Sequence, residues 1–149
     1  MPTSGSALTQ VAISATLHCL AGCAIGEVAG MAIGTALGFS DWGTVALAVV
    51  LAFVFGYSLT SLPLLRAGLA LAVVVPIALA SDTLSIFVME IVDNTIVVVI
   101  PGALEAGLGD LLFWGSLSVG LVLAGVVAVP VNRWPVSYTH LTLPTTPYV

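Results

Sequence analysis

Apolar residues form four long runs along the chain, at about residues 7–38, 43–62, 67–100 and 111–131. An α-helix rises about 1.5 Å per residue, so about 20 apolar residues cross the hydrocarbon core of a bilayer. Each run is long enough, and the first and third exceed one crossing. The pattern therefore predicts an all-α integral membrane bundle of about four transmembrane helices.

The third run contains an internal break signal. Pro76 is followed by the polar pair Ser81 and Asp82, so a kink or a division into two half-helices is expected there. A complete division would leave a first half, 67–80, of about 21 Å, which is too short for a core of about 30 Å. We therefore expect four spans, with the first and third long or kinked.

Composition supports the membrane interpretation. The chain is 60% hydrophobic and 6% charged, and its only Lys or Arg residues are Arg66 and Arg133. A soluble domain has about 25% charged residues. The lipid bilayer is thus an expected partner, and nucleic acid is not, because its phosphates need basic side chains.

The two arginines also predict an orientation. Arg66 follows the second run and Arg133 the fourth, whereas acidic residues occupy the other two connections. By the positive-inside rule, both termini are expected in the cytoplasm of a bacterial cell, with the chain in its inner membrane. Trp42 and Trp114 are then expected at interfacial depth on the outer side.

The end of the chain differs from the rest. After Trp134 the sequence reads "PVSYTHLTLPTTPYV", which is rich in Thr and Pro and has no apolar period. We expect a transmembrane domain over 1–135 and a tail over 136–149 that is either non-native, similar to translated adapter sequence, or disordered. His140 is therefore not assigned as a ligand.

The first run carries reactive side chains at helical spacing. At about 100° per residue, Cys19, Cys23 and Glu27 form one stripe, while His18 points about 100° away. A glycine ladder overlaps this stripe, and such a ladder lets another helix approach closely. The stripe is therefore expected to face protein. The members of the ladder are Gly22, Gly26, Gly30, Gly34 and Gly38.

Thiol and imidazole groups favour soft transition metals. Copper, zinc and mercury are the expected ions, with Cys19 and Cys23 as primary ligands and His18 as an auxiliary ligand. Met31 or Met89 would add a thioether, and Glu27 would add a carboxylate. A disulfide is the competing chemistry, but two cysteines one helical turn apart rarely reach its geometry.

The third run offers a second polar face. Its side chains share one side of a helix, and spans one and three are expected to run in the same direction, so the two faces meet at similar depth. These acids cannot all stay ionised in a dry interior without protons or a cation. In a simpler alternative, Glu90, Asp93 and Asn94 lie hydrated near the outer interface and only mark the end of the buried part of the helix. The face comprises Asp82, Ser85, Met89, Glu90, Asp93 and Asn94.

Four segments also carry a family resemblance: "HCLAGCAIGEVAGMAIGTALG", "FGYSLTSLPLLRAGL", "DTLSIFVMEIVDN" and "VNRW". Over residues 16–134 the chain resembles a bacterial family of small membrane proteins known as a domain of unknown function. The resemblance implies a short multi-span helical unit with a His-Cys-x-x-x-Cys-x-x-x-Glu segment on the first span. It implies no activity, although members are loosely associated with copper or heavy-metal handling.

Three functions remain open. The first is binding or transport of a soft metal ion, with a proton or cation path along Glu27, Asp82, Glu90, Asp93 and Asn94. The second is a proton-coupled or cation-conducting pore with incidental cysteines. The third is a scaffold subunit assembled through the glycine ladder. An enzyme is not expected, because adjacent Cys and His on a helix point apart. Four helices enclose little space, so we expect a homo-oligomer.

Overall fold

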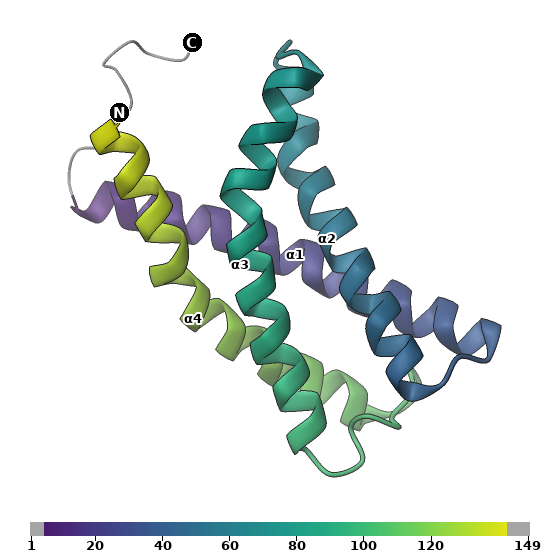
Figure 1. Ribbon diagram of the computed structural model, residues 1–149. Helices are drawn as coiled ribbons and strands as arrows, with labels where there is room; N and C mark the ends of the chain where they lie inside the picture. The colour runs from purple at the N-terminus through teal and green to yellow at the C-terminus, as the bar shows by residue number, and fades with distance from the viewer. Residues whose placement is uncertain (1–4, 143–149) are drawn as a thin grey trace.

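The computed structural model describes residues 5–142, and it is helical almost throughout (Figure 1). Four helices follow in chain order: α1 (Gly5–Leu37), α2 (Asp41–Arg66), α3 (Leu71–Val99) and α4 (Leu111–Thr142). Within the described range there is no strand. Each helix contains a stretch long and apolar enough to cross a membrane. The prediction of an all-α bundle with four spans is confirmed.

The structure bears on two expected features, the undivided third span, which agrees with the prediction of four spans, and the end of the last helix. Helix α3 continues through Pro76 without dividing, because a proline removes one backbone hydrogen bond while the bonds of the flanking turns persist. Helix α4 continues to Thr142, past the predicted boundary at residue 135, so 136–142 has helical backbone. Residues 143–149 lie outside the described residues. The non-native origin of the tail stays a prediction.

The connections form where local backbone chemistry ends each helix. Gly38 has φ +75° and Gly68 has φ +92°, a conformation that favours glycine just past a helix C-terminus. Ser40 then begins α2, since its hydroxyl accepts a hydrogen bond from the Gly43 amide at 3.1 Å. Gly38 therefore ends α1 and does not serve as the fifth step of a packing ladder.

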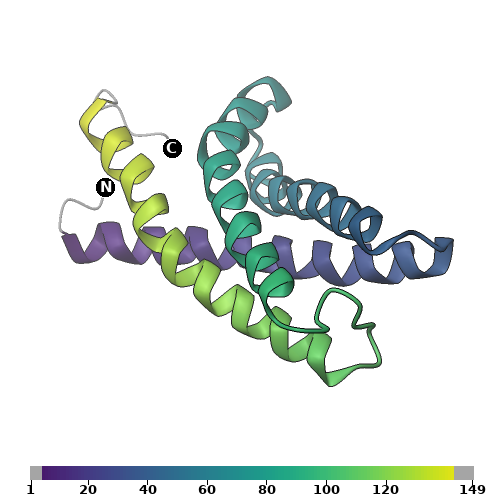
Figure 2. The same ribbon diagram turned by 60° about the horizontal axis from the view of Figure 1, so that its bottom comes forward.

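Helix α1 is the centre of the arrangement. It contacts each of the other three helices, while α2 and α4 do not contact one another. Figures 1 and 2 show α1 crossing behind α3, with α2 and α4 to either side of that crossing. The side chains of α1 can therefore meet those of α3 at the centre of the protein.

The first four glycines of the ladder pack against α2. A Cβ built on Gly22 would lie 2.6 Å from Cα of Gly56, and one on Gly30 would lie 2.5 Å from Cα of Ala48. Gly26 and Gly34 meet α2 in the same way, at Ala52 and Thr44. The close approach predicted for the ladder is confirmed, but its partner is in the same chain. A homo-oligomer, which stays a prediction, would need another surface.

Helix α4 closes the other side of α1 through a buried polar contact. The Asn132 side-chain amide donates to the Thr16 hydroxyl at 2.7 Å, and that hydroxyl donates to the carbonyl of Ala12. All three residues are buried. This contact joins the beginning of α1 to the far half of α4.

Large apolar side chains are exposed on the outside of all four helices, as a surface in contact with lipid requires. Together with the four candidate spans, this surface is that of a multi-pass membrane protein. Examples are Leu17, Val50, Phe87 and Val126.

Candidate cation pathway

The thiol stripe of α1 faces the acidic side of α3. Cys19 and Cys23 are 2% and 1% exposed, so neither points to lipid. The Cys19 thiol lies 4.0 Å from Oδ1 of Asp82, and Cys23 lies beside Glu90. Residue numbers rise in the same direction on both helices at these contacts. The two faces therefore meet as the sequence predicts.

The acidic contact continues beyond the thiols. Glu27 of α1 lies against both Glu90 and Asp93 of α3, and the amide of Asn94 donates to the Glu90 carboxylate at 3.2 Å. Three carboxyl groups are thus neighbours in the interior. Glu90 and Asp93 are 4% and 1% exposed, so the alternative of hydrated groups that merely end the buried part is wrong for these two.

Most oxygens of these carboxyl groups have no hydrogen-bond donor. A buried acceptor without a donor is rare, because its desolvation is not compensated. The described residues with such atoms form a continuous series along α1 and α3, which we call the candidate pathway. The unpartnered atoms are Glu27 Oε1, Asp82 Oδ2, Ser85 Oγ, Glu90 Oε1 and both Oδ atoms of Asp93.

Neither arginine lies beside this series, and among the basic residues only His18 comes near it, at the Asp82 end. Arg66 ends α2, and exposed Arg133 lies in the far half of α4, at the opposite ends of these helices from the acidic contact around Glu27. His18 is exposed, and its Nδ1 lies 3.3 Å from the backbone carbonyl of Ser14. The imidazole is therefore not brought to the thiols, in line with its position about 100° from Cys19 on the helical wheel.

The predicted soft ligands are only partly assembled. Cys19, Cys23 and Met89 belong to one buried cluster, whereas Met31 lies further along α1, where it accepts a hydrogen bond from Thr35 at 3.6 Å. Among the residues whose side chains the structure describes, no three His, Cys, Asp or Glu side chains are arranged to hold one metal ion.

Helix α4 contributes space to the pathway. Gly120 lies so close to Asp93 that a Cβ on this glycine would collide with the Asp93 carboxylate. Asp93 can be buried at the α3–α4 contact because position 120 has no side chain. The sequence pattern did not single out Gly120, since its role depends on which helix packs against α3.

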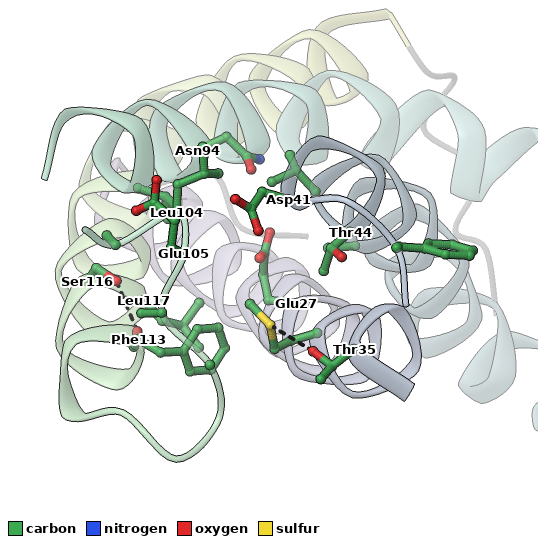
Figure 3. A pocket seen from close by; sticks show the side chains of 18 residues that line it. Glu27, Thr35, Asp41, Thr44, Asn94, Leu104, Glu105, Phe113, Ser116 and Leu117 are labelled. Atoms are coloured by element: carbon green, nitrogen blue, oxygen red, sulfur yellow. Dashed lines mark hydrogen bonds between the residues drawn. The ribbon is translucent and has the colours of Figure 1, made fainter. Parts of the chain in front are cut away.

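At one end, the pathway opens into a cavity of about 310 Å³, which we call the vestibule. Its walls come from the end of α1, the beginnings of α2 and α4, the end of α3 and the loop 100–110. Glu27 forms its inner wall. Figure 3 shows the carboxyl groups of Glu27 and Asp41 and the amide of Asn94 directed into the same space.

Sequence reasoning assigned Asp41 and Glu105 only to outer turns, yet both line the vestibule. A signal was present, because two short acidic connections were expected on the same side of the membrane. Trp42 and Trp114 are exposed at this end of α2 and α4, and the Trp114 indole donates to the Leu108 carbonyl at 2.8 Å. Exposed tryptophans at a helix end are typical of interfacial depth.

At the opposite end, the pathway reaches Asp82. The hydroxyl of Ser81 donates to Oδ1 of Asp82 at 3.0 Å, and Ser81 is exposed. Thr83 follows Asp82 in α3, and its hydroxyl group shares a hydrogen bond of 2.6 Å with the Tyr57 hydroxyl group of α2. Exposed hydroxyl groups therefore adjoin the last buried carboxyl group.

Comparison with known proteins gives a family but no activity. No curated protein and no solved structure matches the chain. One family description matches residues 9–139, which span all four candidate membrane helices. The chain belongs to the family described as "Domain of unknown function (DUF4396)".

Proposed function

We propose that this membrane protein moves a cation along the series of buried carboxyl groups between α1 and α3, from the vestibule at Glu27 to Asp82. The observation that carries the proposal is the set of carboxylate oxygens without hydrogen-bond donors, five in the described residues. A carboxylate at membrane depth costs about 2.5 kcal/mol or more and is usually functional.

The negative charges of the buried carboxyl groups define which species the protein would move. Ionised Glu27, Glu90 and Asp93 would repel one another, because they lie together with no basic group between them. Bound protons or a bound cation remove that repulsion. Protons are the simplest cargo, since neighbouring carboxyl groups can pass them from one to the next.

The orientation of the path follows from the arginines. With Arg66 and Arg133 on the cytoplasmic side, the vestibule opens outward and Asp82 lies toward the cytoplasm of a bacterial inner membrane. We infer no enzymatic activity, because the imidazole of His18, the expected partner of a cysteine nucleophile, is not beside either thiol.

The experiment is proton flux into liposomes that contain the purified protein, driven by a potassium gradient with valinomycin and read with an internal pH dye. Glu90→Gln and Asp93→Asn keep the side-chain size and remove the titratable group. We expect each to lower the flux by about 100-fold or more, the effect of losing a positioned proton-transfer group.

Asp110→Asn is the matched control. Asp110 lies on the loop outside the vestibule, where it accepts a hydrogen bond from the Gly107 amide at 2.9 Å, and asparagine keeps the acceptor. Its flux should equal that of the wild type. Equal flux in wild type, Glu90→Gln and Asp93→Asn would show that protons do not use this path.

A soft metal ion is the second candidate cargo, and one observation favours it: three sulfur-containing residues, Cys19, Cys23 and Met89, belong to one buried cluster. Copper, zinc or mercury would exchange between these sulfurs and the neighbouring carboxyl groups. The test is metal analysis of protein purified with each ion present. Stoichiometric metal in the wild type that is lost in Cys19→Ser/Cys23→Ser supports this cargo, and metal-free wild type rejects it.

A further inference from the structure

The vestibule has the size of a small-molecule site. Its volume of about 310 Å³ compares with about 30 Å³ for one water molecule in the liquid and with about 300–1,000 Å³ for typical ligand pockets. A bare inorganic ion with its ligands needs less space. The cavity therefore suits an occupant with several non-hydrogen atoms.

The polar groups of the vestibule select for positive charge. Glu27 is 9% exposed, its Oε1 has no hydrogen-bond donor, and its carboxyl group points into the cavity (Figure 3). Asp41 and Glu105 line the same cavity from two different connections. Neither Arg66 nor Arg133 lines it. An unpartnered carboxylate, nine-tenths buried in the cavity wall, is complementary to a cationic hydrogen-bond donor.

The carboxyl groups are not arranged as ligands of one metal ion. In the part of the chain that the structure describes, no three acidic, His or Cys side chains form such a group. Asp41, Glu105 and Glu27 come from separate elements around the cavity. An ammonium group suits this spacing, because its N–H donors point in several directions.

The remaining wall of the vestibule is largely apolar. Phe113 and Leu117 of α4 line it and are 6% and 5% exposed, and Val97 of α3 and Val45 of α2 add to this wall. An aromatic ring attracts a nearby cation, and apolar walls favour a hydrocarbon body. Carboxyl groups and apolar walls in one cavity are complementary to an amphipathic cation.

We propose that the vestibule binds a small organic cation, with its ammonium group at Glu27 and its apolar body against Phe113 and Leu117. The hydroxyl groups of Thr44 and Ser116 and the amide of Asn94 also line this cavity. This inference deepens the proposed function by naming a class of cation at the outer end of the path.

Isothermal titration calorimetry of the full chain in detergent tests the inference, with benzylammonium as the probe. Benzyl alcohol has nearly the same shape without the charge, and Mg²⁺ has the charge without the apolar body. We expect saturable binding of benzylammonium alone. Equal binding of benzyl alcohol, binding of Mg²⁺ in place of benzylammonium, or no saturable binding of benzylammonium would overturn the proposal.

Two variants locate the binding. Glu27→Gln should weaken benzylammonium by at least about tenfold, since it removes a charged hydrogen-bond acceptor. Asp110→Asn also removes one acidic charge near this end but does not line the cavity, so its affinity should match the wild type. Equal weakening in both variants would mean general attraction to an acidic surface and would reject the site.

Binding and transport can fail separately. The titration uses no membrane gradient, so benzylammonium can bind in a protein that carries no proton flux, and flux can persist in a protein that binds no amine. Thermal unfolding of Glu27→Gln in the same detergent shows whether the variant is folded. If it does not fold, Phe113→Ala replaces it, with a weaker affinity for benzylammonium as the expected result.

Discussion

Gly120 gives a direct way to disturb the pathway without changing any acidic residue. A Cβ at this position would collide with Oδ1 of Asp93 and would lie 3.0 Å from its Cγ and 3.3 Å from its Cα, closer than ordinary contact at 3.4–4 Å. The Asp93 side chain must therefore turn away in Gly120→Ala. A displacement on the order of 1 Å lowers a geometry-dependent transfer rate by up to about 100-fold.

Two alanine variants on the same helix are the controls. Gly115→Ala adds the same methyl group where nothing lies within 4 Å, so it reports the gain in helix propensity of about 1 kcal/mol. Gly125→Ala places its Cβ 2.9 Å from Cδ1 of Leu20, a flexible apolar side chain outside the acidic series. This variant reports the effect of a crowded helix contact in which no carboxylate is displaced.

The assay is the liposome proton flux, with thermal unfolding of each variant in detergent. We expect flux to fall by about 10- to 100-fold in Gly120→Ala and to stay near the wild-type value in Gly115→Ala and Gly125→Ala. Gly120→Ala should remain folded, because the closest colliding group is a side-chain carboxylate and the contact with the Asp93 Cα at 3.3 Å needs a shift of only about a few tenths of an ångström. Equal flux in Gly120→Ala and Gly125→Ala would refute the role of the Asp93 position.

Two stability predictions follow from the helix contacts. Gly30→Ala should lower the stability by about 1–3 kcal/mol, because its Cβ would overlap Ala48, whereas Gly115→Ala should raise it slightly; melting temperatures that shift in the same direction would contradict the close α1–α2 contact. Thr16→Val removes the acceptor of the Asn132 amide and should cost about 0.6–1.7 kcal/mol in an SDS unfolding titration, so an unchanged midpoint would contradict that bond.

The helical periodicity of the first span predicted much of the pathway. The positions of Cys19, Cys23 and Glu27 on one stripe require that all three face the same neighbour, and in the structure that neighbour is protein. Their contact with α3 followed from charge, because an acidic face of a membrane helix avoids lipid. The wheel also placed His18 outside this stripe, where the structure leaves it.

Other features depend on which helices pack together, and a single sequence does not specify this. The glycine ladder predicted a close neighbour, but only the fold identifies α2 as that neighbour. Gly120 and Asn132 are ordinary residues in the sequence, and they matter because α4 lies against α3 and α1. Asp41 and Glu105 became vestibule residues once the two connections were folded against each other.

The central position of α1 has a consequence for biosynthesis. Helix α1 leaves the ribosome first, yet it needs α3 to cover Glu27 and α4 to supply the Asn132 contact. The contact between the glycine ladder and α2 can form earliest, because α2 is the next helix in the chain. An α1–α2 hairpin can therefore enter the bilayer as a unit. Until α3 is inserted, the carboxyl group of Glu27 lacks the neighbours that cover it in the folded protein.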